Sequence, residues 1–303
     1  MSNLSLKMRE LLKNNFLYHL PKVVEIQKSF DGTEKFVLQL DDGAQIEMVL
    51  IPEGKKNTLC ISTQVGCSRG CVFCATGKYG LRRNLSQVEI ISEIIVAQQA
   101  LKKQNIETSL TNIVFMGMGE PLDNYDNVLK ALKIIVSSDG FCFSSRRITI
   151  STSGVVPLIY RIAEAGINIK LAISLNAAIK EKRSKLMPIN DIYSLEELKK
   201  SLIYFRRHTK FRITIEYIML HNFNMFYEDV KAIIQYCGDL SCKLNLIKWN
   251  FVEGCNLESP TEEQIIEFFK ALQVFPHAVI LRKSRGTDIA GACGQLIVKN
   301  SEE

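Results

Sequence analysis

The chain has 303 residues, of which 47% are hydrophobic and 23% charged, and its formal net charge is +6. These proportions are typical of a globular protein and exclude a disordered or fibrous chain. No apolar run approaches the roughly 18–20 residues of a membrane-spanning helix. The amphipathic N-terminus carries Glu10 and does not fit a secretory signal peptide. We therefore expect a cytoplasmic protein with no membrane partner, and the length predicts one large α/β domain with a small appendage.

The first fifty residues predict a helix followed by a small antiparallel unit. The helix lies within residues 1–20, and strand-like runs follow at 22–29, 35–40 and 45–51. Asp-Gly dipeptides at residues 31–32 and 42–43 separate these runs, and this dipeptide is the strongest short signal for a hairpin turn.

From residue 58 the pattern becomes an alternation of strands and helices. We expect strands at 58–65, 112–118, 147–152, 168–175, 212–220, 244–249 and 278–282. Residues 86–103 should form a helix with Val88, Ile91, Ile94, Ile95 and Leu101 on one side. Capping-box patterns open three helices, at residues 86–89, 194–197 and 261–264. Six strand–helix alternations indicate a parallel sheet, either a partial barrel or a doubly wound sheet, whose chemistry lies at the carboxyl ends of the strands.

The chain has nine cysteines, and an odd number does not fit a framework of disulfide pairs. The cysteines therefore favour metal or redox chemistry. Cys67, Cys71 and Cys74 follow the first parallel strand in a CxxxCxxC spacing, with glycines around them that allow a tight turn. Three thiolates on one loop suit a four-iron cluster that keeps one iron open. The alternative is a zinc site that recruits Cys60 as its fourth ligand.

Small and polar residues end the following strands. Gly119 and Glu120 follow the second strand. The glycine would let a ligand come close to the protein backbone, and the glutamate would bind the ligand's ammonium group. The ends of later strands carry hydroxyls and amides, which suit a ribose and an adenine edge. The candidate residues there are Ser151, the run Ser174, Leu175 and Asn176, and Asn250. For Ser153 the alternative is that it caps the next helix.

The cysteine motif at the end of the first strand of such a chain resembles the radical SAM superfamily. A narrower set of motifs is similar to the adenine-methylating RNA methyltransferases of the RlmN/Cfr family. These motifs are TLCISTQVGC at 58–67, CVFCATG at 71–77, GMGEP at 117–121, STSGVVP at 151–157, SLN at 174–176, KLNLIKWN at 243–250 and RGTDIAGACGQL at 285–296. The resemblance runs from about residue 20 to residue 296.

The resemblance implies a partial (β/α)6 radical SAM barrel, similar to a TIM barrel, with a small N-terminal helix and an antiparallel β appendage. Residues 1–52 would be the remnant of an N-terminal RNA-binding region with its β-meander. Residues 53–286 would form the radical SAM core, and residues 287–303 the catalytic cysteine loop and tail. The cofactors implied are a 4Fe–4S cluster on Cys67, Cys71 and Cys74, and S-adenosylmethionine, two per turnover.

The resemblance also implies three catalytic residues. Cys293 would accept a methyl group and, after radical activation by a 5′-deoxyadenosyl radical, deliver its carbon to adenine. Cys60 would then attack the Cys293 sulfur and release the product, leaving a transient disulfide, and Glu47 would take the ring proton. The motifs favour 2-methyladenosine as product, and methylation of carbon 8 is the alternative. A zinc-stabilised RNA-binding module and a radical SAM enzyme with another substrate are rival interpretations.

The implied partners are 23S rRNA, tRNA as a second substrate, a flavodoxin-like electron donor and a thiol reductant, and we expect a monomer. Basic pairs that could contact RNA phosphates occur at residues 82–83, 146–147, 206–207 and 282–283, provided that they converge at the barrel mouth. Family members usually begin with a longer helical RNA-binding domain, near whose end this sequence starts. A second departure is Asn176, at a position where the family commonly has histidine.

Overall fold

A ten-stranded sheet forms the centre of the molecule. The computed structural model describes residues 4–15, 19–104 and 109–298. The strand order is β1-β2-β3-β4-β7-β8-β9-β10-β11-β12. The strands are β1 (Lys22–Lys28), β2 (Glu34–Gln39), β3 (Gln45–Glu53), β4 (Lys56–Ile61), β7 (Asn112–Phe115), β8 (Ile148–Thr152), β9 (Lys170–Ser174), β10 (Ile213–Met219), β11 (Cys242–Lys248) and β12 (Val279–Arg282).

The sheet changes from antiparallel to parallel at β4. Strands β1 to β4 pair antiparallel, and each pair from β4 to β12 is parallel. The predicted antiparallel appendage and parallel α/β core are therefore confirmed. The proposed boundary between residues 52 and 53 falls inside β3, whose hydrogen bonds to β4 join the two parts into one sheet.

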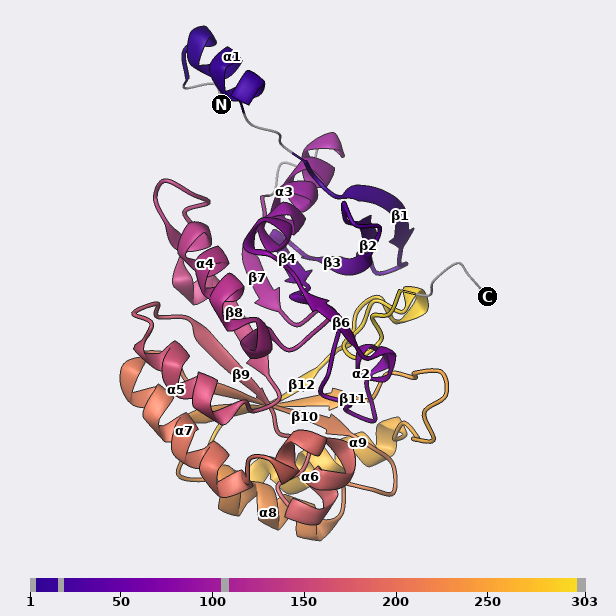
Figure 1. Ribbon diagram of the computed structural model, residues 1–303. Helices are drawn as coiled ribbons and strands as arrows, with labels where there is room; N and C mark the ends of the chain where they lie inside the picture. The colour runs from indigo at the N-terminus through magenta and orange to yellow at the C-terminus, as the bar shows by residue number, and fades with distance from the viewer. Residues whose placement is uncertain (1–3, 16–18, 105–108, 299–303) are drawn as a thin grey trace.

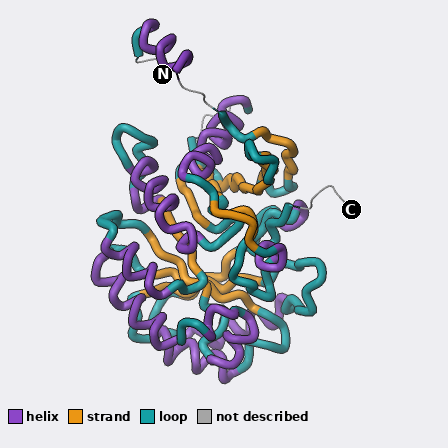
Figure 2. Tube along the Cα trace, in the orientation of Figure 1, coloured by secondary structure: helices purple, strands orange, loops and turns teal. Residues whose placement is uncertain are grey.

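Helices follow most parallel strands and cover the outer side of the sheet, as Figure 1 and the purple segments of Figure 2 show. They are α3 (Gln87–Lys103), α4 (Tyr125–Val136), α5 (Val156–Glu164), α6 (Lys180–Leu186), α7 (Leu195–His208), α8 (Tyr227–Cys237) and α9 (Glu262–Ala271). The three predicted capping boxes are present at the starts of α3, α7 and α9. Each satisfies backbone N–H groups that a helix start otherwise leaves unbonded.

The buried side of α3 differs from the predicted one. Val88 is 64% exposed, whereas Ile90, Ile94 and Ala97 are fully buried. The buried stripe also contains Glu93, a residue that an apolar pattern excludes. Its carboxylate accepts a hydrogen bond from the backbone N–H of Ser62 and thereby ties α3 to the end of β4.

The parallel strands are apolar on one face and carry polar side chains among apolar ones on the other. Along β8, Ile148 and Ile150 are buried against the helices, and Ser151, the residue after Ile150, is half-buried. We call the polar side the inner face. On β11 the same alternation places Leu244 in the core and Lys243 on the inner face. The inner face is therefore available for binding and catalysis, and the apolar face stabilises the fold.

The predicted strand at 58–65 is two strands. β4 ends at Ile61, and β5 (Gln64–Gly66) leaves the main sheet and pairs antiparallel with β6 (Leu81–Asn84). The break lies at Ser62, whose hydroxyl donates to the carbonyl oxygen of Glu47. The small sheet brackets residues 67–80, which contain the short helix α2 (Ala75–Tyr79). The cysteine motif is thus held at both ends by one hairpin.

The N-terminal helix α1 spans Leu6–Asn15, inside the predicted range, and none of its residues is buried. Part of the predicted helix, residues 1–3 and 16–18, lies outside the described residues. Within the part of the chain that the structure describes, no helix is both long and apolar enough to cross a bilayer.

The chain segment after β7 passes very close to β5. Gly119 has a φ of +99°, and a Cβ added there would lie 2.6 Å from the Cβ of Gln64. The Gln64 side chain accepts a hydrogen bond of 2.8 Å from the backbone N–H of Glu120. Glycine is required at residue 119 both for its backbone conformation and for this close approach.

We expect Gly119→Ala to destabilise the protein more than Gly43→Ala. Gly43 has a similar φ of +82° but open space around it. Gly43→Ala should therefore cost only the backbone strain, roughly 1–2 kcal/mol, whereas Gly119→Ala adds overpacking of roughly 1–3 kcal/mol. Urea unfolding followed by circular dichroism measures both losses. Equal losses would contradict the close packing of this segment on β5.

Candidate active site

A cavity of about 140 Å³ lies at the carboxyl ends of the parallel strands. We call it the cluster cavity because all three cysteines of the motif line it. Its walls also include five of the residues expected to bind a cofactor, namely Gly119, Glu120, Ser151, Ser174 and Asn176. These five residues lie at the carboxyl ends of three neighbouring strands, β7, β8 and β9, and the parallel topology brings them together as expected.

Cys67 is buried, Cys71 and Cys74 are half-buried, and none of the three forms a disulfide. Burial raises the pKa of Cys67 to about 12, and it raises the pKa values of Cys71 and Cys74 as well. Buried thiols with raised pKa values form thiolates when a metal cation binds them. The donor set therefore fits an iron–sulfur cluster, which three cysteine thiolates can hold.

The positions of the cysteines argue against the zinc alternative. Among the described residues, no three His, Cys, Asp or Glu side chains are placed to hold a single metal ion. Structural zinc needs four ligands around one ion, but Cys60 lines a different cavity from the other three cysteines. In a four-iron cluster each thiolate binds its own iron, so the sulfurs lie farther apart than ligands of one ion.

Glu120 presents a carboxylate to the cluster cavity. Its Oε2 accepts hydrogen bonds of 2.7 Å from both the backbone N–H and the hydroxyl of Ser153. Its Oε1 accepts from the backbone N–H of Leu122 at 3.1 Å. Burial raises the pKa of Glu120, and no ion pair of this carboxylate is present among the described residues. A cationic group of a ligand would stabilise its ionised form.

The helix-capping alternative for Ser153 is wrong. Helix α5 begins after Val155 without a side-chain cap, and the Ser153 hydroxyl donates to Glu120 instead. The serine orients the carboxylate, a role that spacing along the sequence could not reveal.

A buried arginine fixes the carboxyl ends of β8 and β9. Arg183 on α6 is 1% exposed and donates hydrogen bonds to the carbonyl oxygens of Ser153, Ser174 and Leu175. Burial lowers its pKa to about 10. The predicted residue Leu175 is itself fully buried in the core and does not line the cluster cavity.

Asn176 occupies a left-handed conformation, with φ of +57°. Asparagine tolerates this conformation better than most residues. Its side-chain oxygen accepts a hydrogen bond from the backbone N–H of Ile218 on β10. Asn176 lines the cluster cavity, but its side chain already holds the end of β9 against β10.

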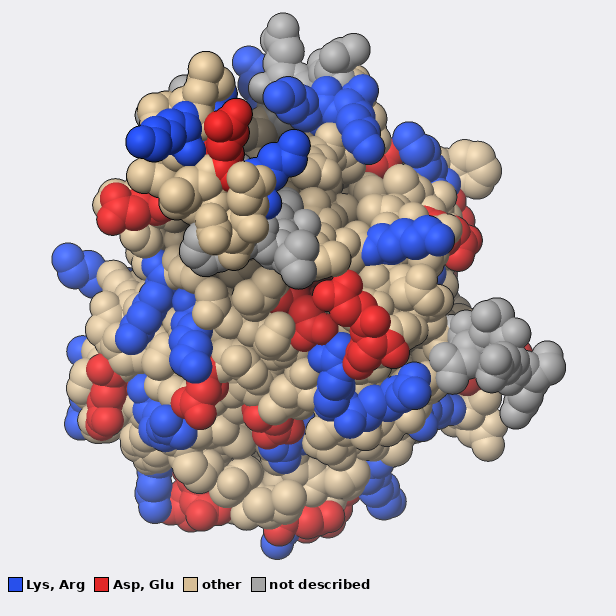
Figure 3. Space-filling view, turned by 45° about the horizontal axis from the view of Figure 1, so that its top comes forward, with Lys and Arg blue, Asp and Glu red and all other residues tan. Residues whose placement is uncertain are grey.

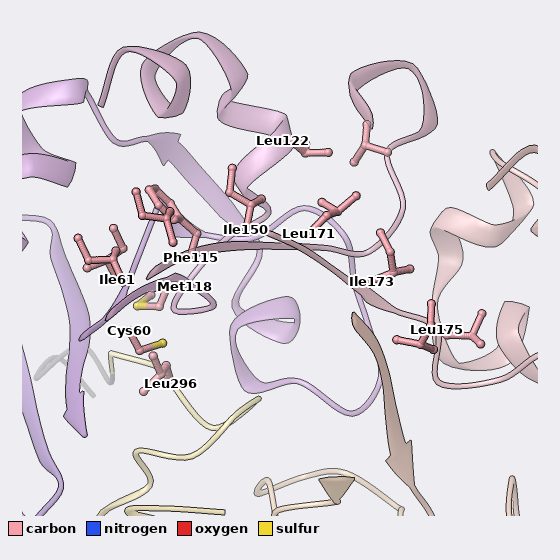
Figure 4. Close-up of a cluster of buried hydrophobic side chains, with 14 of the residues drawn as sticks. Cys60, Ile61, Phe115, Met118, Leu122, Ile150, Leu171, Ile173, Leu175 and Leu296 are labelled. Carbon is pink, nitrogen blue, oxygen red and sulfur yellow. The ribbon is translucent and has the colours of Figure 1, made fainter. Parts of the chain in front are cut away.

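A second cavity of about 450 Å³ adjoins the first. We call it the cysteine cavity because Cys60 and Cys293 both line it. Cys293 also lines the cluster cavity, and so do Met116, Ile247 and Leu296, which form the shared wall. Figure 4 shows Cys60 beside Leu296, which belongs to this wall. Burial and then the proximity of Cys293 raise the pKa of Cys60.

The loop that carries Cys293 is attached to the cysteine motif. The backbone N–H of Ala75 donates to the carbonyl oxygen of Gly294 at 2.7 Å, and the Thr76 hydroxyl donates to that of Leu296 at 2.6 Å. The predicted residue Asn250 donates from its side chain to the carbonyl oxygen of Cys293 at 3.1 Å. Asn250 does not line the cluster cavity, so its contact holds the Cys293 loop.

Sequence reasoning missed an ion pair on the inner face. The Arg282 guanidinium lies 3.4 Å from the Glu216 carboxylate. Proximity to Cys293 is the largest effect that raises the pKa of Arg282. A glutamate in the middle of the run TIEYIM at 214–219 was the available signal, because charged residues rarely occupy a buried strand without a partner.

Glu47 lines neither cavity. Its Oε1 forms an ion pair of 3.0 Å with Lys35, and its Oε2 accepts a hydrogen bond of 2.8 Å from the backbone N–H of Ile297. Burial raises the pKa of Glu47, and Lys35 opposes that rise. The structure therefore places Glu47 against the segment that follows Cys293 and outside the cavity that Cys60 and Cys293 line.

The basic pairs do not converge at the carboxyl ends of the strands. Arg83 is bound in ion pairs with Asp42 and Glu89. The pairs at 146–147 and 206–207 precede β8 and β10, and so lie at the amino ends. These pairs therefore do not meet the condition of convergence at the barrel mouth. Figure 3 shows basic side chains in separate groups with acidic side chains between them.

The comparisons with known proteins agree with this site. Residues 61–237 match the family model of the radical SAM superfamily. A probable dual-specificity RNA methyltransferase RlmN from Dictyoglomus turgidum is 45% identical over 98% of this chain and 84% of its own length. The dual-specificity RNA methyltransferase RlmN of Geobacter sulfurreducens is 45% identical over 91% of this chain and 74% of its own length.

A solved structure gives the same result. The crystal structure of a radical SAM methyltransferase from Sphaerobacter thermophilus is 36% identical, covers 97% of this chain and 86% of its own, and superposes with a TM-score of 0.92. Full-length similarity at this identity, together with the three-cysteine cavity, shows that the chain belongs to the radical SAM superfamily and, within it, to the RlmN family of RNA methyltransferases.

Proposed function

We propose that the protein methylates carbon 2 of adenosine in 23S rRNA and in tRNA, with Cys293 as the carrier of the methyl group. The observation that supports this proposal most strongly is the position of Cys293, which lines the cluster cavity and the cysteine cavity together. A side chain at a shared wall can receive a group on one side and present it on the other.

The cluster cavity would hold the cofactors. Cys67, Cys71 and Cys74 would bind a 4Fe–4S cluster, and the carboxylate of Glu120 would bind the ammonium group of S-adenosylmethionine. The hydroxyls of Ser151 and Ser174 would bond to its ribose, since both line the same cavity. When bound, these groups supply a methyl group and one-electron chemistry that protein side chains lack.

The cysteine cavity would receive the adenine. Cys293, once methylated, would present its methyl carbon there, and Cys60 would attack the Cys293 sulfur to release the product. A disulfide between Cys60 and Cys293 would form, and an external thiol would reduce it. A Glu47 that accepts the ring proton would first have to lose its hydrogen bond from Ile297, so this role requires movement of the segment after Cys293.

The choice of carbon 2 rests on sequence motifs and on the family. The proline of GMGEP, the serine of STSG and Trp249 are similar to the carbon-2 enzymes, and carbon 8 is the competing product. The names of the relatives state dual specificity for RNA, which supports more than one RNA substrate for this chain. An electron donor similar to flavodoxin would complete the reaction, and we propose a cytoplasmic monomer.

Anaerobic reconstitution tests the cluster. The chain should take up about four irons and four sulfides and absorb broadly near 400 nm. Cys67→Ala, Cys71→Ala and Cys74→Ala should each lose most of this iron because each removes a ligand. Cys142→Ala is the matched control, since Cys142 is exposed and far from the motif in sequence. One zinc per chain and no colour would refute the cluster, as would equal iron loss in the control.

Mass spectrometry tests Cys293 as the carrier. Protein produced in cells that contain S-adenosylmethionine should carry one added methyl on the peptide with Cys293, and the peptide with Cys237 should carry none. Cys60→Ala should retain that methyl and accumulate a covalent complex with RNA, because the step that releases the product is lost. An unmodified Cys293 in repeated preparations would contradict the proposal.

A further inference from the structure

Four basic residues lie together at the amino ends of the parallel strands. Arg146 and Arg147 precede β8, Lys170 is the first residue of β9, and Lys243 is the second residue of β11. Arg146 and Arg147 are exposed, and the two lysines are half-buried. We call these four residues the basic group. It lies at the opposite end of the parallel strands from the cluster cavity, and it has no role in the function proposed above.

Strand alternation places both lysines on the inner face. Lys170 is four residues before Ser174 on β9, and Lys243 is four residues before Ile247 on β11. Ser174 and Ile247 line the cluster cavity. Because residues an even number apart on a strand point to the same side, Lys170 and Lys243 point to the same side as the cavity.

The charges of the basic group are only partly compensated within the described residues. Burial lowers the pKa of Lys170, and repulsion from Lys243, Arg147 and Arg146 lowers it further. None of the four forms an ion pair with an acid in the described part of the chain. Glu216 on this face is paired with Arg282, and its charge also interacts with that of Lys243. Because this one carboxylate is shared between Arg282 and Lys243, the group keeps an excess of positive charge.

Hydrogen bonds connect the basic group to the cysteine cavity. Arg147 donates to the side-chain oxygen of Asn112 at 3.4 Å, and Asn112 donates to the hydroxyl of Thr58 at 3.2 Å. Thr58 lines the cysteine cavity together with Cys60. The edge of the basic group is thus two side chains away from the wall of the cavity in which the adenine would react.

We propose that the RNA backbone docks on the basic group at the amino ends of β8, β9 and β11, and that the adenine enters the cysteine cavity from this side. The proposal rests on the function proposed above. In this arrangement the cofactor and the RNA bind at opposite ends of the parallel strands. The cofactor would occupy the carboxyl ends, which the cysteine motif and the Cys293 loop cover, and the RNA would approach the amino ends. Phosphates would supply the missing negative charge, and a base taken out of its stack would reach Cys293.

Salt-dependent RNA binding tests this docking surface. The full-length chain is titrated into a fluorescent RNA hairpin with adenosines in its loop, and anisotropy is measured at several KCl concentrations. The double variant Lys170→Gln with Lys243→Gln should bind at least tenfold more weakly than the parent. The slope of log affinity against log salt should fall by roughly 1.4–1.8, since each phosphate contact contributes roughly 0.7–0.9.

The matched control removes the same charge elsewhere. Lys130→Gln with Lys231→Gln lies on the outer helices α4 and α8, where both lysines are exposed, and it should keep the parent affinity and slope. Arg146→Gln is a second variant that keeps the test valid if the first double variant does not fold, because Arg146 is exposed and lies outside the strands. It removes one charge, and it should therefore lower the logarithm of the affinity and the salt slope by about half as much as the double variant.

Two results with the variants would overturn the proposal. The first is that both the inner-face double variant and Arg146→Gln bind the hairpin with the affinity and salt dependence of the parent. The second is that the outer-helix control loses as much affinity as the inner-face double variant. If the parent chain carries methylated Cys293 but binds no hairpin, the docking surface fails while the cluster chemistry stands. If it binds the hairpin with the predicted slope but carries no methyl, the docking surface stands and the proposed mechanism fails.

Discussion

The attachment of the Cys293 loop to the cysteine motif is the constraint on which the site depends. Ala75 donates to Gly294 and Thr76 to Leu296, so helix α2 and the loop after β12 form one unit. Trp249 adds a third connection, because its indole N–H donates to the carbonyl oxygen of Phe73 at 3.1 Å. The Thr76–Leu296 bond joins residues 220 apart in the sequence, and the Trp249–Phe73 bond joins residues 176 apart. The two bonds to the loop after β12 hold Cys293 at the wall between the two cavities.

The fold gives this unit a rigid support. Arg183 ties the ends of β8 and β9, and Ser153 holds the Glu120 carboxylate in the cluster cavity. Side chains whose rotamers are held by such bonds can keep a ligand in a productive geometry. The chemistry proposed at the carboxyl ends therefore depends on polar groups that are already oriented before a ligand binds. The inner face between the two strand edges is where cofactor and RNA would meet.

Much of the fold could be predicted because its signals are local. Capping boxes, Asp-Gly turns and alternating strands each involve a few neighbouring residues, and the cysteine spacing identified one wall of the cluster cavity. Contacts between distant segments could not be predicted in this way. Leu175 and Asn250 lie just after strands β9 and β11, but packing turns the first into the core and the second toward the Cys293 carbonyl. The Arg282–Glu216 pair joins two strands whose sequences carry no mutual signal.

The central claim is that Cys293 carries the carbon that becomes the methyl group of the product. The most direct measurement is a single turnover on RNA with protein whose Cys293 bears a deuterated methyl and with unlabelled S-adenosylmethionine. The account predicts 2-methyladenosine that contains deuterium in its methyl group, as read by nucleoside mass spectrometry. Unlabelled 2-methyladenosine in that first turnover would contradict it, whereas deuterium in 8-methyladenosine would contradict only the choice of carbon 2.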